Sequence, residues 1–307
     1  MINIYYKSAK DSAVSVLDTP RKGSWISATM PDSKDIATLS KLLDLDQDTL
    51  TDALDPYEAP RIATDEKDVY IFTRYCHPEN KFSSTEPMLI LFTPSEVVTV
   101  SPYAVDFLTD MPKKINPTTT QKTKLVLELL RQVNETYKAY LNDITRTIFK
   151  IRTQLKSTSL SNEDFLVFID IEEDLNEMLT SLQPYSLVLE ALFSGKYVPL
   201  HEEDHDLVED LKLSTSELIE LTRSRLRTME NIRDVYNTIT TNTLNATFKR
   251  LTSISIFLAI PTIIGGLYGM NISLPFSNHR FAFYIIVGAT LMIIAGIVHI
   301  FNRKKWL

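Results

Sequence analysis

The sequence is poor in cysteine, in glycine and in positive charge. Its 307 residues include one cysteine, Cys76, which excludes an intrachain disulfide and a multi-cysteine metal site and is typical of a reducing compartment. The formal net charge of -7 at pH 7 disfavours nucleic acid as a partner. With seven glycines and 14 prolines, the chain is expected to be rich in helix. The N-terminus, MINIYYKSAKDSAV, lacks the apolar core of a signal peptide, so we expect it to stay in the cytosol.

Formal charge is almost absent near the C-terminus. Between residues 251 and 301 the one charged residue is Arg280, which separates two uncharged runs, Leu251–Met270 and Phe281–Phe301. A helix of about 20 residues crosses the hydrocarbon core of a bilayer, and soluble helices rarely stay apolar on every side for so long. The sequence therefore predicts a hairpin of two transmembrane helices.

Positive residues flank this hairpin at its two outer ends. Lys249 and Arg250 precede the first span, the segment Arg303–Lys305 follows the second, and the connecting loop has only Arg280. The positive-inside rule then places both termini in the cytoplasm and the loop, residues 271–280, outside. We expect a multi-pass protein of the cytoplasmic (cell) membrane.

The residues before the hairpin show two kinds of pattern. The runs INIYY, VYIFTRY, MLILF and EVVTVS predict strands, and SKDIATLSKLLDL, with Ser33 as a candidate N-cap, and QDTLTDAL predict helices. After Pro117 one long helix ends near KSTSLSNED, a second near Ser194, and a third runs from Glu202 without glycine or proline until Pro261.

The predicted fold is an α+β membrane protein with three parts. Residues 1–116 form a cytosolic α/β domain, residues 117–250 form a helical region with a long stalk helix, and residues 251–307 form the transmembrane hairpin, with spans at about 251–270 and 281–301. A stalk helix that runs on into a membrane needs neighbours along its length, so we expect an oligomer.

Small and polar residues follow one side of the first span. They recur at threes and fours and comprise Asn245, Thr252, Ser255, Ala259, Thr262 and Gly266. Such a stripe allows close helix packing, and Gly265–Gly269 is itself a GxxxG pattern. The alternative is a water-filled pore. Two spans per chain are too few to enclose a pore, which therefore requires a ring of subunits.

Asn271 lies at the outer end of this stripe. Its side-chain carbonyl and amide suit hydrogen bonding to the water shell of a hydrated cation, and Mg²⁺ gives up its waters reluctantly. A ring of such asparagines, with nearby backbone carbonyls, selects a hydrated divalent ion by size and hydrogen-bond geometry. The sequence thus indicates a divalent cation as the cargo.

Three features in separate parts of the chain point to one family. They are YGMN (Tyr268–Asn271), the two C-terminal spans followed by the basic end RKKWL, and DPYEAPR (Asp55–Arg61), which is similar to a D-x-x-E-x-P-R segment. Together they resemble the CorA family of magnesium transporters. The resemblance implies a homopentamer with a funnel-shaped cytosolic assembly, in which the first span lines the pore and Gly269, Met270 and Asn271 form the selectivity filter.

The resemblance also implies roles for residues further upstream. Ungapped counting from the filter places Asn245, Leu251 and Thr262 at pore-facing positions, with Leu251 in a hydrophobic gate. Asp210 and Asp234 fall where the family has carboxylates that bind cytosolic Mg²⁺ between subunits and hold the pore closed. Mg²⁺ is therefore expected both as cargo and as regulatory ion, with no organic cofactor.

Departures from the family pattern leave other cargo ions open. Ala259 stands where a bulky methionine is often found, and the outer loop ISLPFSNHR has no carboxylate to gather cations. A transporter of Zn²⁺, Co²⁺ or Ni²⁺ is the alternative, and a metal sensor that conducts nothing is a further one. An inside-negative potential supplies roughly 4.6 kcal/mol per 100 mV to an entering divalent ion, so uptake needs no ATP.

An enzyme is the remaining alternative class. HEEDH (His201–His205) matches the H-E-x-x-H signature of zinc metalloproteases. Pro199 precedes it, carboxylates crowd it, and it begins the stalk helix instead of lying in the middle of a helix over a dry cleft. The sequence carries no Walker A or dinucleotide motif. We therefore expect a transporter and no enzyme activity.

Overall fold

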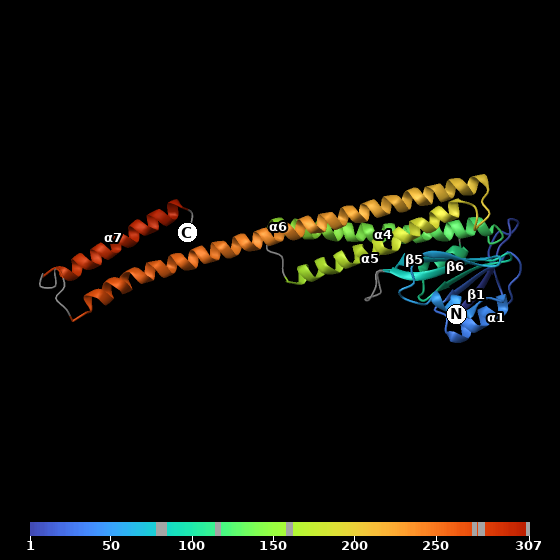
Figure 1. The fold of residues 1–307 in the computed structure, drawn as a ribbon, viewed down its shortest axis with the longest axis horizontal. Coiled ribbons are helices and arrows are strands. Elements are labelled where there is room, and N and C mark those ends of the chain that lie inside the picture. The colour runs from blue at the N-terminus through green and yellow to red at the C-terminus, as the bar shows by residue number, and fades with distance from the viewer. Residues whose placement is uncertain (78–84, 114–117, 158–161, 272–274, 276–279, 305–307) are drawn as a thin grey trace. The chain divides into compact units, whose positions relative to one another are not determined.

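The structure, a computed structural model, describes residues 1–77, 85–113, 118–157, 162–271, 275 and 280–304. The chain forms two compact units, residues 1–230 and residues 231–307. Figure 1 shows the ribbon, in which helix α6 (Glu202–Tyr268) contributes residues to both units. The three-part division expected from the sequence, with boundaries at 116 and 250, stays a prediction, and residue 116 lies outside the described residues.

A seven-stranded mixed sheet, in the order β2-β1-β3-β7-β6-β5-β4, organises the first unit. Its strands are β1 (Ile2–Tyr6), β2 (Ser15–Leu17), β3 (Trp25–Thr29), β4 (Arg61–Asp65), β5 (Asp68–Cys76), β6 (Thr85–Phe92) and β7 (Val97–Ser101). Strands β3 and β7 pair in parallel, and the other neighbours pair antiparallel. The four strands predicted from INIYY, VYIFTRY, MLILF and EVVTVS are confirmed as β1, β5, β6 and β7.

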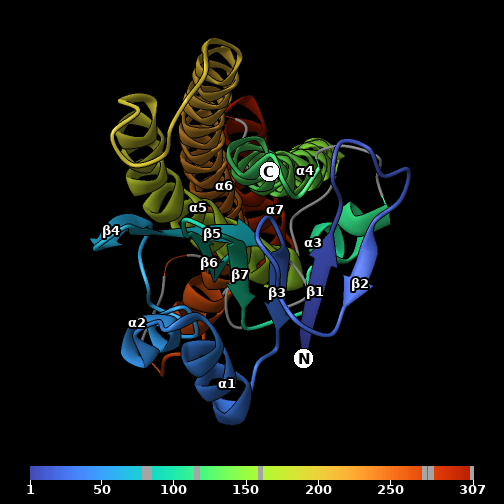
Figure 2. The ribbon, with the colours of Figure 1, turned by 90° about the vertical axis from the view of Figure 1, so that its right-hand side faces the viewer.

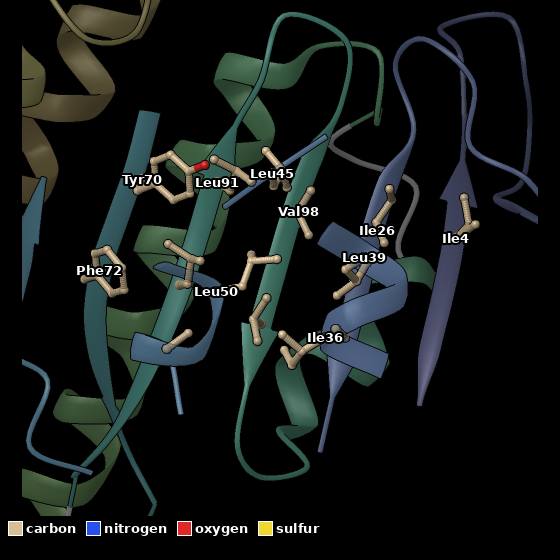
Figure 3. Packing of buried hydrophobic residues seen from close by; sticks show 14 residues of the cluster. Ile4, Ile26, Ile36, Leu39, Leu45, Leu50, Tyr70, Phe72, Leu91 and Val98 are labelled. Atoms are coloured by element: carbon tan, nitrogen blue, oxygen red, sulfur yellow. The ribbon is translucent and has the colours of Figure 1, made fainter. Parts of the chain in front are cut away.

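Helices cover both faces of this sheet (Figure 2). Helices α1 (Ser33–Leu43) and α2 (Gln47–Asp52) lie on one face, and α4 (Lys122–Ser157) and α5 (Asn162–Phe193) lie on the other. Because side chains alternate along a strand, the central strands β5, β6 and β7 contribute to two cores, and this explains their near-continuous apolar runs. Figure 3 shows the core beneath α1 and α2, whose labelled residues include Ile26, Leu39, Leu50, Phe72, Leu91 and Val98.

Strands β2, β3 and β4 are not among the predicted strands. β3, with the sequence WISAT, is buried next to β7, but its serine, alanine and threonine weaken the apolar pattern. The turn before it needs glycine, because Gly23 has φ +87° and a Cβ there would lie 2.9 Å from the Thr120 Cγ2 atom. β2 and β4 are the two edge strands of the sheet, and edge strands carry polar residues more readily.

The predicted cap of α1 is wrong by one residue. Asp32, and not Ser33, is the N-cap, and its carboxylate accepts hydrogen bonds from the backbone N–H groups of Lys34 and Asp35 at 2.9 and 2.7 Å. In turn, the Asp35 carboxylate accepts a hydrogen bond from the Asp32 backbone N–H at 3.4 Å, which completes a capping box. A carboxylate is the stronger acceptor at a helix N-terminus because it also interacts favourably with the helix dipole.

The three long helices agree with the sequence pattern. α4 ends at Ser157 and α5 at Phe193, close to the predicted ends, and α6 runs without a break from Glu202 to Tyr268 with Pro261 inside it. A short helix α3 (Asp106–Asp110) and a 3₁₀ turn η1 (Met111–Lys113) precede α4. Asn134 of α4 donates to the Thr215 hydroxyl of α6 at 3.0 Å, so the first part of α6 belongs to the first unit.

The second unit consists of the remainder of α6 and helix α7 (Ala282–Arg303). Both helices contain an 18-residue window long and apolar enough to cross a membrane, with mean hydropathy 1.8 in α6 and 2.3 in α7. Most of their apolar side chains are exposed, for example Leu258 and Met292. Most of the predicted outer loop, and Trp306 with the end of the basic segment, lie outside the described residues.

Candidate functional site

The last turn of α6 leads directly into Gly269, Met270 and Asn271. The helix ends at Tyr268, the Gly269 N–H donates to the Gly265 carbonyl oxygen at 2.9 Å, and the next N–H reaches back three residues. A Cβ at position 269 would lie 3.2 Å from that same carbonyl oxygen. Such a contact is tighter than side chains usually make, so glycine lets the chain leave the helix without displacing its backbone.

Asn271 is exposed immediately beyond this turn. Its neutral side chain carries an amide N–H₂ donor and a carbonyl acceptor. The neighbouring Tyr268 hydroxyl donates to the Pro275 carbonyl oxygen at 3.4 Å, a long contact across the turn. The end of α6 therefore presents a neutral side chain that can both donate and accept hydrogen bonds.

All seven predicted pore-lining residues are exposed in the second unit. They are Asn245, Leu251, Thr252, Ser255, Ala259, Thr262 and Gly266. The covered side of the same helix carries Ser253, which is fully buried, and Phe257, whose ring centroid lies 5.8 Å from that of Phe301 in α7.

The exposed stripe lies opposite the covered side of α6. Buried and half-buried residues of this stretch comprise Ser253, Ile256, Phe257, Ile260 and Ile264. At about 100° per residue, this set and the predicted stripe are centred roughly 135° apart around the helix axis. α7 therefore leaves the stripe uncovered, available to water or to other chains.

Hydroxyl groups on the stripe are held in a defined direction. The Ser255 hydroxyl donates to the Leu251 carbonyl oxygen at 3.0 Å, and the Thr262 hydroxyl donates to the Leu258 carbonyl oxygen at 2.8 Å. Since each proton is used within the helix, the hydroxyl oxygens remain as acceptors. Water around a cation offers its hydrogens outward, so such a surface suits a hydrated cation.

Asp210 and Asp234 belong to different units of the chain. Asp210 lines a cavity of about 220 Å³ between α4 and α6, together with Lys124 and Arg131. Asp234 belongs to the second unit, where it is exposed. The part of the chain that the structure describes holds no group of three or more His, Cys, Asp or Glu residues placed to bind a metal ion.

The HEEDH segment forms the start of α6. His201 precedes the helix, and its backbone N–H donates to the buried Asp204 carboxylate at 3.0 Å, which is a capping interaction. The Lys124 ammonium lies 2.8 Å from Glu203 and lowers the pKa of that carboxyl. These residues thus start and anchor a helix. His201, Glu202, Glu203 and Asp204 also line a cavity of about 840 Å³, but the described residues hold no group of three or more His, Cys, Asp or Glu side chains placed to bind a metal ion.

The DPYEAPR segment supports the fold of the first unit. The Arg61 guanidinium contacts Glu58 at 2.5 Å and Asp52 at 3.0 Å, and it lies over the Phe72 ring at 4.1 Å. These contacts fasten the turn between α2 and β4 to the sheet. The similarity of this segment to the family pattern thus has a structural basis.

A buried cation next to this turn is absent from the sequence predictions. Arg74 of β5 donates to the carbonyl oxygens of Pro56, Glu58 and Thr85 at 2.7, 3.1 and 2.6 Å, and it lies 3.7 Å from the Glu177 carboxylate on α5. The network joins the sheet, the DPYEAPR turn and α5. An arginine inside the otherwise apolar run VYIFTRYC was the signal that could have indicated it.

Comparison with known proteins connects these features. A family model described as CorA-like Mg²⁺ transporter protein matches residues 21–304, which include both units. The chain belongs to this family. The CorA-like match confirms the expected resemblance, and it agrees with the prediction of a transporter over an enzyme.

Individual relatives agree in length and fold. The chain is 26% identical to the cobalt/magnesium transport protein CorA of Methanocaldococcus jannaschii over 295 residues, which cover 92% of this chain and 91% of that protein. The complete structure of the CorA magnesium transporter from that organism is similar with a TM-score of 0.87 and 22% identity, covering 100% and 99% of the two chains. The ZntB cytoplasmic domain from Vibrio parahaemolyticus matches 78% of this chain and 98% of its own, with a TM-score of 0.64 and 11% identity. These structures show a shared fold.

Proposed function

We propose that this chain conducts divalent cations, chiefly Mg²⁺, across the cytoplasmic membrane as a homopentameric channel. The observation that carries the proposal is the CorA-like match over residues 21–304, within which Gly269, Met270 and Asn271 directly follow α6 and the apolar helix α7 comes next. The two helices cross the bilayer with both termini in the cytoplasm, as the distribution of lysine and arginine indicates. The membrane potential drives uptake.

The uncovered stripe on α6 supports an assembly of several chains around one axis. α7 lies against the side of α6 that bears Phe257, while the stripe from Asn245 to Gly266 faces outward. Exposed hydroxyl and backbone groups are costly in lipid, so they must face water or another helix. A ring in which α6 is the inner helix and α7 the outer one satisfies both helices. Leu251, at the cytoplasmic end of the span, supplies a hydrophobic gate.

Asn271 selects the ion at the outer mouth of this ring. Copies of its amide accept hydrogen bonds from the waters around Mg²⁺, whose tightly held first shell has a fixed size. The turn at Gly269 places backbone carbonyls beside this position. Neutral ligands hold the hydrated ion weakly enough for release, which carboxylates in the same place would prevent.

The same recognition of a hydrated ion determines which cations can be transported. Co²⁺ and Ni²⁺ resemble Mg²⁺ as hydrated ions, and the M. jannaschii relative is described as a cobalt/magnesium transport protein. A flux series with Mg²⁺, Co²⁺, Ni²⁺ and Zn²⁺ therefore tests the assignment. We expect Mg²⁺ to pass most readily, and uptake of Zn²⁺ in preference to Mg²⁺ would replace Mg²⁺ as the cargo.

The decisive experiment is ion flux into liposomes that contain the purified protein and a Mg²⁺ dye. In Asn271→Ala we expect uptake to fall by about 10- to 100-fold, the equivalent of losing a charge-assisted hydrogen bond of ~1.5–3 kcal/mol. Asn302→Ala, the same change near the end of α7, is the matched control and retains uptake. Unchanged flux in Asn271→Ala, or a wild type that conducts nothing, contradicts the proposal; cross-linking of intact liposomes checks for five subunits.

Closure by cytosolic Mg²⁺ is the regulatory part of the proposal. In this proposal each of Asp210 and Asp234 binds Mg²⁺ together with a ligand from a neighbouring subunit; among the described residues of one chain no group of three or more His, Cys, Asp or Glu is placed to bind a metal ion. Facing carboxylates repel one another until a divalent ion bridges them, so loss of the ion loosens the ring. Asp210→Ala combined with Asp234→Ala should raise the internal Mg²⁺ concentration that halves uptake. Inhibition identical to wild type would remove these two residues from the gate.

A further inference from the structure

The C-terminal end of α7 carries two polar side chains on one side of the helix. His299 and Arg303 are four residues apart, so they lie one turn apart on the same side, and both are exposed. An imidazole in the last turns of an otherwise uncharged span is costly beside hydrocarbon and normally has a polar partner. His299 belongs neither to the stripe on α6 nor to the segment Gly269–Asn271, so the proposed pore does not account for it.

This side of α7 faces away from α6. The buried and half-buried residues of α7 comprise Ala282, Ile286, Gly288, Thr290, Ile294, Ile297, Val298 and Phe301. At about 100° per residue, this set and the pair of His299 and Arg303 are centred roughly 165° apart around the helix axis. Phe301, whose ring lies near that of Phe257, marks the side that meets α6. His299 and Arg303 therefore lie on the outer side of the hairpin.

Apolar and small residues continue the same side into the span. Ile285, Met292 and His299 follow one another at intervals of seven residues, close to two helical turns, and the first two are exposed. Gly296 lies one turn from His299, and a Cβ added to it would meet no described atom within 4 Å. The helix surface next to His299 is therefore shallow, and an acyl chain can lie along it as far as Ile285.

The charge of this part of the chain is positive and has no internal counter-charge. After Asp234 the sequence contains no Asp or Glu, while six Lys and Arg residues follow, five of them in the segments 249–250 and 303–305 that flank the two spans. Phospholipid phosphates at the surface of a bilayer are the anions within reach of the ends of two spans, and they attract such basic segments. The charge of these segments therefore complements that of an anionic headgroup.

We propose that the outer side of α7 binds one anionic phospholipid of the cytoplasmic leaflet. The Arg303 guanidinium donates two N–H hydrogen bonds to phosphate oxygens of the headgroup, and the His299 imidazole donates a third. The acyl chains lie along Gly296, Met292 and Ile285. This inference rests on the proposed placement of α6 and α7 across a bilayer, but it does not depend on ion conduction.

The same surface discriminates against two related ligands. Phosphatidylcholine carries a quaternary ammonium beside its phosphate, and this cation would be repelled by Arg303 and the adjacent Lys304. A free phosphate ester has no acyl chains, so it gains nothing from the apolar side of α7. The site is thus specific for a lipid that combines net negative charge with acyl chains.

Native mass spectrometry of the full-length protein in detergent, titrated with dioleoylphosphatidylglycerol, tests the proposal. We expect one tightly bound lipid per chain, and an affinity for dioleoylphosphatidylcholine that is at least tenfold lower. Arg303→Gln and His299→Leu should each weaken binding of the phosphatidylglycerol by about tenfold, whereas His299→Gln, which keeps an N–H donor, should retain most of the affinity. Arg250→Gln is the matched control, because Arg250 is an exposed arginine at the same end of the hairpin but belongs to α6, and it should change the affinity by less than about twofold.

Three results would overturn the assignment. The first is equal affinity of the wild type for the two lipids. The second is a loss in Arg250→Gln as large as that in Arg303→Gln, which would mean that lipid responds to total charge and not to a defined site. The third is displacement of the phosphatidylglycerol by a tenfold excess of glycerol 3-phosphate, which would indicate a phosphate site without lipid.

Two controls keep these outcomes separate from misfolding and from the proposed function. Circular dichroism and thermal unfolding verify that each variant is folded, and Arg303→Met, which keeps the length of the side chain without its charge, replaces Arg303→Gln if that variant unfolds. Mg²⁺ flux is measured on the same preparation. A chain that conducts without preferring phosphatidylglycerol contradicts only this inference, and one that binds the lipid but conducts nothing contradicts only the proposed function.

Discussion

The two units of this chain differ in how far their apolar side chains are exposed. In the first unit, apolar side chains of a sheet are buried between two pairs of helices, as Ile26 and Leu89 are, both with no exposed surface. In the second unit, Leu258 is 67% exposed and Met292 is 73% exposed. The first unit can thus bury its apolar surface by folding alone, whereas the second leaves apolar surface exposed on two helices long enough to cross a membrane.

Polar residues show the same contrast. Thr85 in the first unit is fully buried, and its hydroxyl hydrogen-bonds to Glu177 at 2.7 Å. Thr262 in the second unit is exposed, and its hydroxyl donates to the Leu258 carbonyl oxygen of its own helix. A buried hydroxyl like that of Thr85 contributes to stability, while the exposed Thr262 hydroxyl is the kind that the proposed pore would use. The difference indicates where mutations should change stability and where they should change transport.

The largest expected effect on stability is at Arg74. Replacing it by methionine leaves three backbone carbonyl oxygens and the Glu177 carboxylate without their cation, which should lower the free energy of unfolding of the first unit by about 3 kcal/mol. Urea unfolding followed by circular dichroism measures this. Arg223→Met is the matched control, since Arg223 is 42% exposed and pairs only with the nearby Glu220, so its loss should cost less than about 0.5 kcal/mol. If both variants lost the same free energy of unfolding, burial of Arg74 would not explain its contribution to stability.

A second comparison lies within the membrane-spanning part of α6. Thr262→Leu places a larger apolar side chain on the uncovered stripe and should reduce Mg²⁺ uptake by about tenfold, because it narrows the pore and removes an acceptor for the ion's waters. Ile264→Leu, among the half-buried residues on the covered side of α6, should leave uptake nearly unchanged because this side chain faces away from the stripe. Liposome flux measures both variants. If Ile264→Leu were the more damaging change, the stripe would not line the pore.

Long elements of the fold were predictable because their patterns are continuous. α4, α5 and α6 have uninterrupted helical sequences that end near breaks in the pattern, and β5 and β6 are long apolar runs. β3 was not predictable in this way, since its burial comes from pairing with β7, about 70 residues later, and not from its own composition. The cap at Asp32 was missed because two adjacent residues, Asp32 and Ser33, are both good caps and only the backbone distinguishes them.

The candidate site divides in a similar way. The position of Asn271 beyond α6 follows from a short motif next to a long apolar run, and both are visible in the sequence. The sequence does not indicate which side of α6 is covered by α7. Ile254 and Phe257 are both apolar, yet it is Phe257 whose ring lies near that of Phe301. The proposed partners of Asp210 and Asp234 in another subunit cannot be found from periodicity within one chain. The Arg74 network joins four separate segments and depends on tertiary structure.

The smallest expected effect is at the cap of α2 and depends on pH. The Asp46 carboxylate accepts hydrogen bonds from the Thr49 hydroxyl at 2.6 Å and from the Thr49 N–H at 2.9 Å, and these lower its pKa in the folded protein. Because the pKa of Asp46 is lowered in the folded state, this carboxylate stabilises the folded protein at pH values above the ordinary pKa of aspartate. The stabilisation is lost as pH falls through the lowered pKa. Asp46→Ala should therefore lower the thermal midpoint of the first unit slightly at neutral pH and not at all once the carboxyl is protonated. Asp48→Ala keeps the hydrogen bonds between Asp46 and Thr49, so its thermal midpoint should not depend on pH in this way. If Asp46→Ala lowers the thermal midpoint equally at neutral pH and at a pH where the carboxyl is protonated, the charge on the cap does not stabilise α2.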